Sequence, residues 1–163
     1  MSHQDPAQLY QQVVVEHNRS PRNHRVPAPC SHRAHGHNPL CGDEVILFLR
    51  VVEDRIVDAG FQGESCAIAT ASASLLTEAV IGRTVSEAQT LLGAVNAIIT
   101  GAGGPDGQDV AGTQLQVLGN VRRYPGRQKC ATLPWATLAA ALADSGAAAT
   151  VTTEAASVAT AGR

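Results

Sequence analysis

The stretch EVILFLRVVEDRIVDAGF, residues 44–61, decides the fold class of this chain. Its first half is β-branched and apolar, and its second half alternates apolar with polar residues, which is typical of two strands. Glu53 and Asp54 stand between the halves as a tight reversal, so the stretch predicts a β-hairpin of residues 44–52 and 55–61. Upstream, a loop rich in proline and histidine predicts at most a short edge strand over residues 31–36.

Helical patterns flank the hairpin on both sides. Ser65 and Ser86 are placed to cap two of the predicted helices, and Gln89 stands at the capping-box distance from Ser86. Pro134 is tolerable in the first turn of the last helix. The predicted helices are residues 7–18, 66–81, 87–98 and 132–142, with another short helix starting within residues 110–121. A hairpin followed by helices predicts an α+β fold in which helices pack on one face of a small antiparallel sheet.

Composition limits the class of protein. The chain has 163 residues, 44% of them hydrophobic but only 3% aromatic, so we expect one domain with an aliphatic core. That domain is predicted to span residues 1–143, and the Ala- and Thr-rich tail over 144–163 is predicted to be disordered. A formal net charge of −2 argues against nucleic acid as a partner. Without a long apolar segment or a basic leader, we expect no membrane partner and a cytoplasmic protein.

Four cysteines are unusual in a chain without signs of secretion. Metal ligands, catalytic thiols and inert core residues all stay open, because the spacing is far wider than in cysteine pairs of zinc modules. Gly42 allows a sharp turn that aims the Cys41 thiolate and the Asp43 carboxylate at one point. The four are Cys30, Cys41, Cys66 and Cys130.

Cys66 and Cys130 fall at predicted helix starts, where the helix dipole favours a thiolate over a thiol. Arg127 and Lys129, the only lysine, add positive charge beside Cys130. Three thiolates and one carboxylate would suit zinc, or iron bridged by sulfide in a cluster.

An alternative metal site would lie in the N-terminal loop itself, where five possible ligands fall within the twelve residues 30–41. We favour a solvated loop with incidental histidines, and we treat Cys30 as a bystander. The alternative ligands are Cys30, His32, His35, His37 and Cys41.

Three cysteine-centred motifs carry a resemblance to a known family. NPLCGDEV (38–45), FQGESCAIATASASLLTEAVIG (61–82) and RQKCATLPW (127–135) closely resemble the SufU/IscU family of iron-sulfur cluster assembly proteins, which includes the N-terminal domain of NifU. The resemblance runs from residue 8 to residue 143. It implies that the metal and sulfur-handling residues are Cys41, Asp43, Cys66 and Cys130.

Departures from the family pattern favour its SufU branch. Lys129 stands directly before the third motif cysteine, where IscU-type members carry histidine, and the chain between the second and third motif cysteines is longer. The SufU branch implies a zinc-dependent, sulfurtransferase-like accessory protein that accepts persulfide from a SufS-type cysteine desulfurase and serves a downstream Suf assembly complex. Cys41, on a loop, is the expected acceptor. The alternative is a scaffold that builds and transfers a 2Fe-2S cluster on the same ligands.

Overall fold

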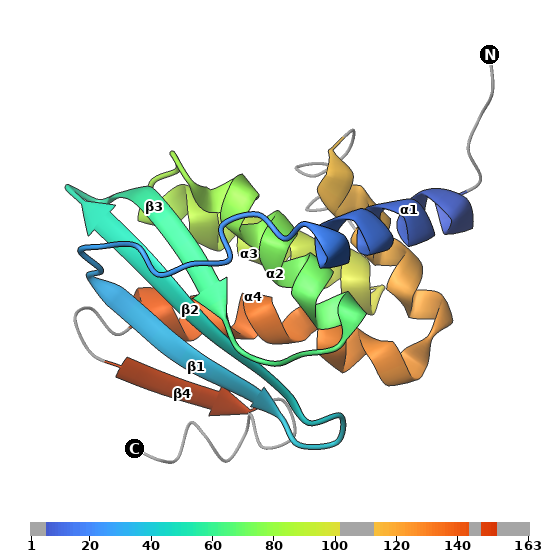
Figure 1. Cartoon of the computed structure of the whole chain (residues 1–163). Coiled ribbons are helices and arrows are strands. Elements are labelled where there is room, and N and C mark those ends of the chain that lie inside the picture. Colours follow the sequence, from blue (N-terminus) through green and yellow to red (C-terminus); the bar gives the residue numbers. More distant parts are fainter. Residues whose placement is uncertain (1–5, 102–112, 144–147, 153–163) are drawn as a thin grey trace.

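A four-stranded sheet covered by helices makes up the structure. The computed structural model describes residues 6–101, 113–143 and 148–152. The sheet has the order β3-β2-β1-β4, and Figure 1 shows α2, α3 and α4 behind it. The helices are α1 (Pro6–Arg19), α2 (Ala67–Val80), α3 (Val85–Thr100), the 3-10 helices η2 (Gln114–Arg123) and η3 (Pro125–Arg127), and α4 (Gln128–Ala143). The strands are β1 (His32–Asn38), β2 (Asp43–Val52), β3 (Arg55–Gln62) and β4 (Ala148–Thr152).

The predicted α+β fold is confirmed, and so is the hairpin. β1, β2 and β3 pair antiparallel, and Glu53 and Asp54 adopt the left-handed φ values of 50° and 68° that a two-residue hairpin turn requires. Alternate residues of β2, namely Val45, Leu47 and Leu49, are fully buried against the helices. The fully buried Trp135 on α4 belongs to the same core.

The expectation of a disordered tail is wrong for Ala148–Thr152. These residues form β4, which pairs parallel to β1, and the rest of the predicted tail lies outside the described residues. Because β4 pairs with it, β1 lies between β2 and β4 instead of at the edge of the sheet. β1 covers His32–Asn38, where residues 31–36 are predicted. That residues 1–143 form one domain stays a prediction.

Both predicted helix caps are displaced. Cys66 caps α2, because its backbone is extended and its thiol accepts a hydrogen bond from the Ala69 N–H at 3.5 Å, while the Ser65 hydroxyl bonds Thr70. Thr84 caps α3 in a complete capping box with Glu87. Ser86, the predicted cap, lies inside the helix.

The last helix begins earlier than predicted. α4 begins at Gln128, so Cys130 lies in its first turn and Pro134 lies within the helix. Proline has no N–H, so Pro134 cannot donate the usual helical hydrogen bond to the Cys130 carbonyl four residues earlier. None of the described helices has the length and apolar character needed to cross a bilayer.

Candidate metal and sulfur site

Cys41 lies on a tight turn between β1 and β2. The strand pairing ends at Asn38 opposite Asp43, which leaves residues 39–42 as the turn, here called the Cys41 turn. The Gly42 N–H donates to the Asn38 carbonyl at 2.8 Å, and Gly42 adopts a φ of 74° that favours glycine. Cys41 is exposed on this turn, whereas Asp43 at the start of β2 is 2% exposed.

Asp43 links the Cys41 turn to the start of α2. One carboxylate oxygen accepts the backbone N–H of Cys66 at 2.8 Å, and the other lies 3.6 Å from the Cys66 sulfur. Gly63 has a φ of 118°, and a side chain there would collide with the Glu44 carbonyl. The connection from β3 therefore passes close to β2 and delivers Cys66 to Asp43.

Cys130 reaches the same point from α4. Its sulfur is fully buried and lies 3.6 Å from the Cys41 sulfur, and the Asn38 amide nitrogen lies 4.0 Å from it. One ligand atom from each of Cys41, Asp43 and Cys130 lies within 4.8 Å of the others. With Cys66 attached through Asp43, these four residues form what we call the cysteine cluster.

Three donors of the cysteine cluster, from Cys41, Asp43 and Cys130, are spaced as a tetrahedral metal ion requires, whereas the Cys66 sulfur lies outside this group of three. Zinc–sulfur bonds of about 2.3 Å in a tetrahedron separate two sulfur ligands by about 3.8 Å. The 3.6 Å between the Cys41 and Cys130 sulfurs is close to this value. Three sulfurs and one carboxylate could equally ligate an iron-sulfur cluster.

The structure separates Cys30 from the cysteine cluster. Cys30 is exposed, and its thiol donates to the His32 carbonyl at 3.1 Å. Of the two predicted near-site cations, Arg127 has its pKa raised, first by the negative charge of Cys66 and then by Cys130. Lys129 is exposed one residue before Cys130.

Comparison with known proteins identifies the family. The model described as the NifU-like N terminal domain matches residues 9–131. The chain belongs to this family. The resemblance inferred from the three cysteine motifs is thereby confirmed.

Relatives of this NifU-like domain carry two kinds of name. The Streptococcus pyogenes protein named iron-sulfur cluster assembly scaffold protein IscU is 34% identical over 134 residues, which are 82% of each chain. The Bacillus subtilis zinc-dependent sulfurtransferase SufU is 35% identical over 130 residues, 80% of this chain and 86% of that protein.

Solved structures agree with the family assignment. One from Fervidobacterium islandicum, described as a candidate iron-sulfur cluster assembly scaffold for the SUF system, superposes with a TM-score of 0.76 at 32% identity. It covers 83% of this chain and 97% of that chain. A NifU-like N-terminal domain from Brucella abortus, 21% identical, shares the fold with a TM-score of 0.73 over 85% of this chain and 96% of that chain.

Two thiols of this NifU-like domain, Cys66 and Cys130, have pKa values shifted in opposite directions. A hydrogen bond from Cys130 lowers the pKa of Cys66 to about 6. The same hydrogen bond, together with burial, raises the pKa of Cys130. Cys66 is therefore a stronger acid than Cys130.

Sequence reasoning missed two side chains beside the cluster. Asn38 is 1% exposed. It is the first residue of the NPLCGDEV motif, and this position could have indicated it. Tyr10 on α1 stacks on Tyr124 at 6.1 Å, and burial raises its pKa to about 12. Its hydroxyl is buried without a hydrogen-bond partner among the described residues, and no local sequence signal marks it.

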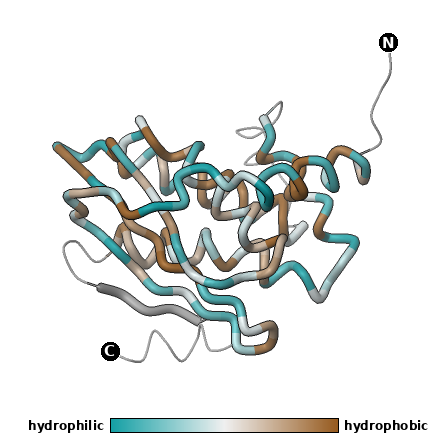
Figure 2. The backbone as a smooth tube through the Cα atoms, in the orientation of Figure 1, coloured by the Kyte–Doolittle hydropathy of each residue, from teal (hydrophilic) through white to brown (hydrophobic). Residues whose placement is uncertain are grey.

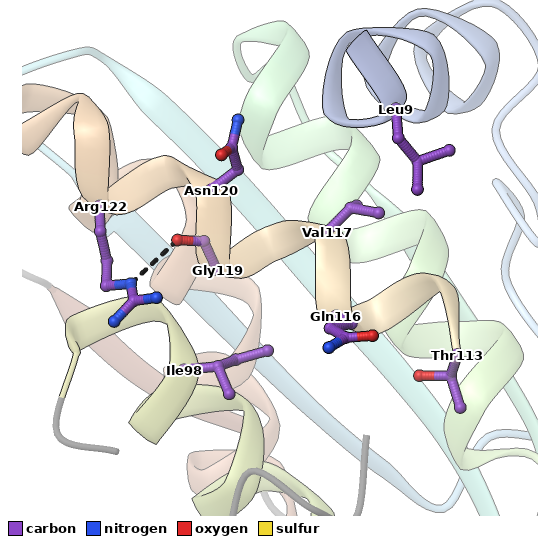
Figure 3. Close-up of a pocket in the computed structure, with 8 residues that line it drawn as sticks. All are labelled: Leu9, Ile98, Thr113, Gln116, Val117, Gly119, Asn120 and Arg122. Carbon is purple, nitrogen blue, oxygen red and sulfur yellow. Dashed lines mark hydrogen bonds between the residues drawn. The ribbon is translucent and has the colours of Figure 1, made fainter. Parts of the chain in front are cut away.

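A cleft of about 430 Å³ lies between α1, α3 and η2. Figure 3 shows Leu9, Ile98 and Val117 lining it together with Arg122, which donates to the Gly119 carbonyl at 3.1 Å. Arg122 is the only ionisable side chain among the described residues that line the cleft. The cleft therefore offers no cluster of nucleophiles, and the reactive groups lie at the cysteine cluster.

Proposed function

We propose that this protein is a zinc-dependent sulfur acceptor in iron-sulfur cluster assembly. It takes persulfide sulfur from a SufS-type cysteine desulfurase and passes it to the downstream Suf assembly complex. The observation that carries the proposal is the placement of one exposed thiol, Cys41, on a glycine turn with its sulfur 3.6 Å from a buried one, Cys130. The name of the Bacillus subtilis relative supports this choice.

The four cluster residues divide into anchors and an acceptor. Cys66 and Cys130 are fixed at the starts of α2 and α4, and Asp43 is held by its hydrogen bond from the Cys66 N–H. Bound zinc would supply the positive charge that keeps the thiols deprotonated. Cys41 is the ligand best placed to leave the cluster, because it is exposed on the short Cys41 turn and lies in neither a helix nor a strand.

Sulfur transfer then needs no oxidant. The Cys41 thiolate attacks the outer sulfur of the persulfide on the desulfurase cysteine. The sulfur–sulfur bond of that persulfide breaks, its electron pair leaves on the desulfurase cysteine as a thiolate, and Cys41 now carries the persulfide. Arg127 favours this anionic product because its guanidinium already interacts with the negative charge of the cluster. Lys129 adds a second cation beside Cys130. The protein acts in this way as a sulfurtransferase-like accessory protein.

Mass spectrometry tests the acceptor directly. After incubation with desulfurase and cysteine, the parent chain should gain one sulfur on Cys41, and the Cys41→Ala variant should gain none and fail to activate the desulfurase. Cys30→Ser is the matched control and should behave as the parent. Unchanged activation with Cys41→Ala would contradict the proposal, and so would a large loss with Cys30→Ser.

A scaffold for a 2Fe-2S cluster on the same ligands is the second candidate. The name of the Streptococcus pyogenes relative and the three-thiolate, one-carboxylate donor set favour it. Supplying iron and sulfide without oxygen separates the two functions. Stable visible absorbance would favour the scaffold, whereas zinc that stays bound and colourless would favour the sulfur acceptor.

A further inference from the structure

The histidines of β1 point alternately to the two faces of the sheet. Ala34, Gly36 and Asn38 are buried on the helix side, so the intervening His35 and His37 lie on the outer face. The tube of β1 is mostly hydrophilic in Figure 2, and His37 is exposed. The sequence predicts incidental histidines in a solvated loop, but β1 brings His35 and His37 to one face of the sheet.

Glu44 on β2 completes this group from the neighbouring strand. It lies directly opposite His37 in the strand register, and its carboxylate oxygen lies 2.6 Å from His35 Nε2. The side chains of His35 and Glu44 are 41% and 45% exposed, so water and solutes reach them. Asp43 is buried on the opposite face, which separates this group from the cysteine cluster.

We propose that His35, His37 and Glu44 form a second metal site, which binds a divalent transition-metal ion such as zinc. Imidazole nitrogen and carboxylate oxygen are both zinc ligands. Histidines two residues apart on a strand have Cα atoms about 6.5 Å apart on one face, and a directly opposed residue has its Cβ atom about 5 Å away. The donor atoms of the three side chains do not all lie within 4.8 Å of one another in the structure, so the exposed His37 imidazole must turn toward the His35–Glu44 contact to join them.

The contact between His35 and Glu44 needs little change to admit the ion. Zinc bonds of about 2.0–2.1 Å to nitrogen and oxygen in a tetrahedron separate the two donors by about 3.3 Å. The observed 2.6 Å is a direct hydrogen bond between the two side chains, which the metal would replace. Water would fill the remaining coordination position, because the face is open. The site does not depend on the proposed sulfur-acceptor function.

Calorimetric titration with zinc tests this site in the full chain. The protein is first loaded with one zinc per chain, verified by metal analysis, and then titrated with more zinc. The parent should bind one further equivalent, and imidazole ¹⁵N resonances of His35 and His37 should shift. His35→Ala, His37→Ala and Glu44→Gln should each weaken the second equivalent at least about tenfold. The first equivalent should not change, which also verifies that each variant folds.

His32→Ala is the matched control. His32 lies on the same strand, but it is an odd number of positions away from His35 and His37, so it belongs to the opposite face of the sheet. It should bind both equivalents as the parent does. The proposal is overturned if the zinc-loaded parent binds no further ion. It is equally overturned if His35→Ala and His37→Ala leave the second equivalent unchanged. Neither result bears on sulfur transfer, which depends on Cys41.

Discussion

At the scale of single residues, the hydroxyl of Ser72 joins the two helices that carry Cys66 and Cys130. It is fully buried, donates to the Ala131 carbonyl at 2.7 Å and accepts the Trp135 indole N–H at 3.0 Å. Ser72→Ala should lower the free energy of unfolding by about 1–3 kcal/mol, because it leaves the buried Trp135 indole N–H unpaired. Urea denaturation followed by tryptophan fluorescence measures this loss.

Ser86→Ala is the control for the Ser72 substitution, because Ser86 is exposed on α3. It should change the free energy of unfolding by less than about 0.5 kcal/mol. Equal effects of the two substitutions would show that the Ser72 bridge contributes nothing. The small residues of AIATASAS indicate close helix packing, but the partners of Ser72 lie 59 and 63 positions away, so local sequence cannot identify them.

At the scale of the elements, α3 depends on the capping box at Thr84. The Thr84 hydroxyl accepts the Glu87 N–H at 3.1 Å, and the Glu87 carboxylate accepts the Thr84 N–H at 2.9 Å. Thr84→Ala should cost about 1 kcal/mol of stability, and this should lower the melting temperature by about 2–4 °C. Ser86→Ala should leave the melting temperature unchanged in the same calorimetric scan. A melting temperature lowered by Ser86→Ala and unchanged by Thr84→Ala would mean that the helix begins at Ser86.

The sequence holds two overlapping cap signals, Thr84 with Glu87 and Ser86 with Gln89, and tertiary contacts decide between them. The end of the hairpin fixes the choice, because the Val85 N–H donates to the Asp54 carbonyl at 2.9 Å and Arg55 forms a β-bridge with Thr84. The hairpin itself was predictable, since its pattern and reversal are local. β4 was not, because its pairing partner β1 lies more than a hundred residues earlier.

For the same reason, the sequence could nominate the cluster residues but could not place them together. Their types and motifs are local, whereas their meeting point depends on how β2, α2 and α4 pack. Spacing alone argued weakly for a shared site. The contact of Cys41 with Cys130 spans 89 positions, and the contact of Cys66 with Asp43 spans 23. The fold brings donor atoms of Cys41, Asp43 and Cys130 within 4.8 Å of one another and holds Cys66 against Asp43.

At the scale of the whole molecule, the cysteine cluster joins the sheet to two helices. Asp43 belongs to β2, Cys66 caps α2, Cys130 lies in the first turn of α4, and Cys41 lies on the turn that follows β1. A metal ion bound by all four would therefore link segments that are distant in the chain. Ligands that bind only the folded state stabilise it in proportion to the logarithm of their concentration relative to Kd.

Zinc removal should for this reason lower the stability of the whole chain. Zinc in hundredfold excess over its Kd contributes about 2.7 kcal/mol, so chelation should lower the melting temperature by about 5–10 °C. Differential scanning calorimetry with and without chelator measures the shift. Cys30→Ser should show the full shift, because Cys30 lies outside the cluster. The Cys66→Ser variant should have a lowered melting temperature both with and without chelator. A parent melting temperature that chelator does not change, in protein shown by metal analysis to have lost its zinc, would contradict a metal that ties the sheet to α2 and α4.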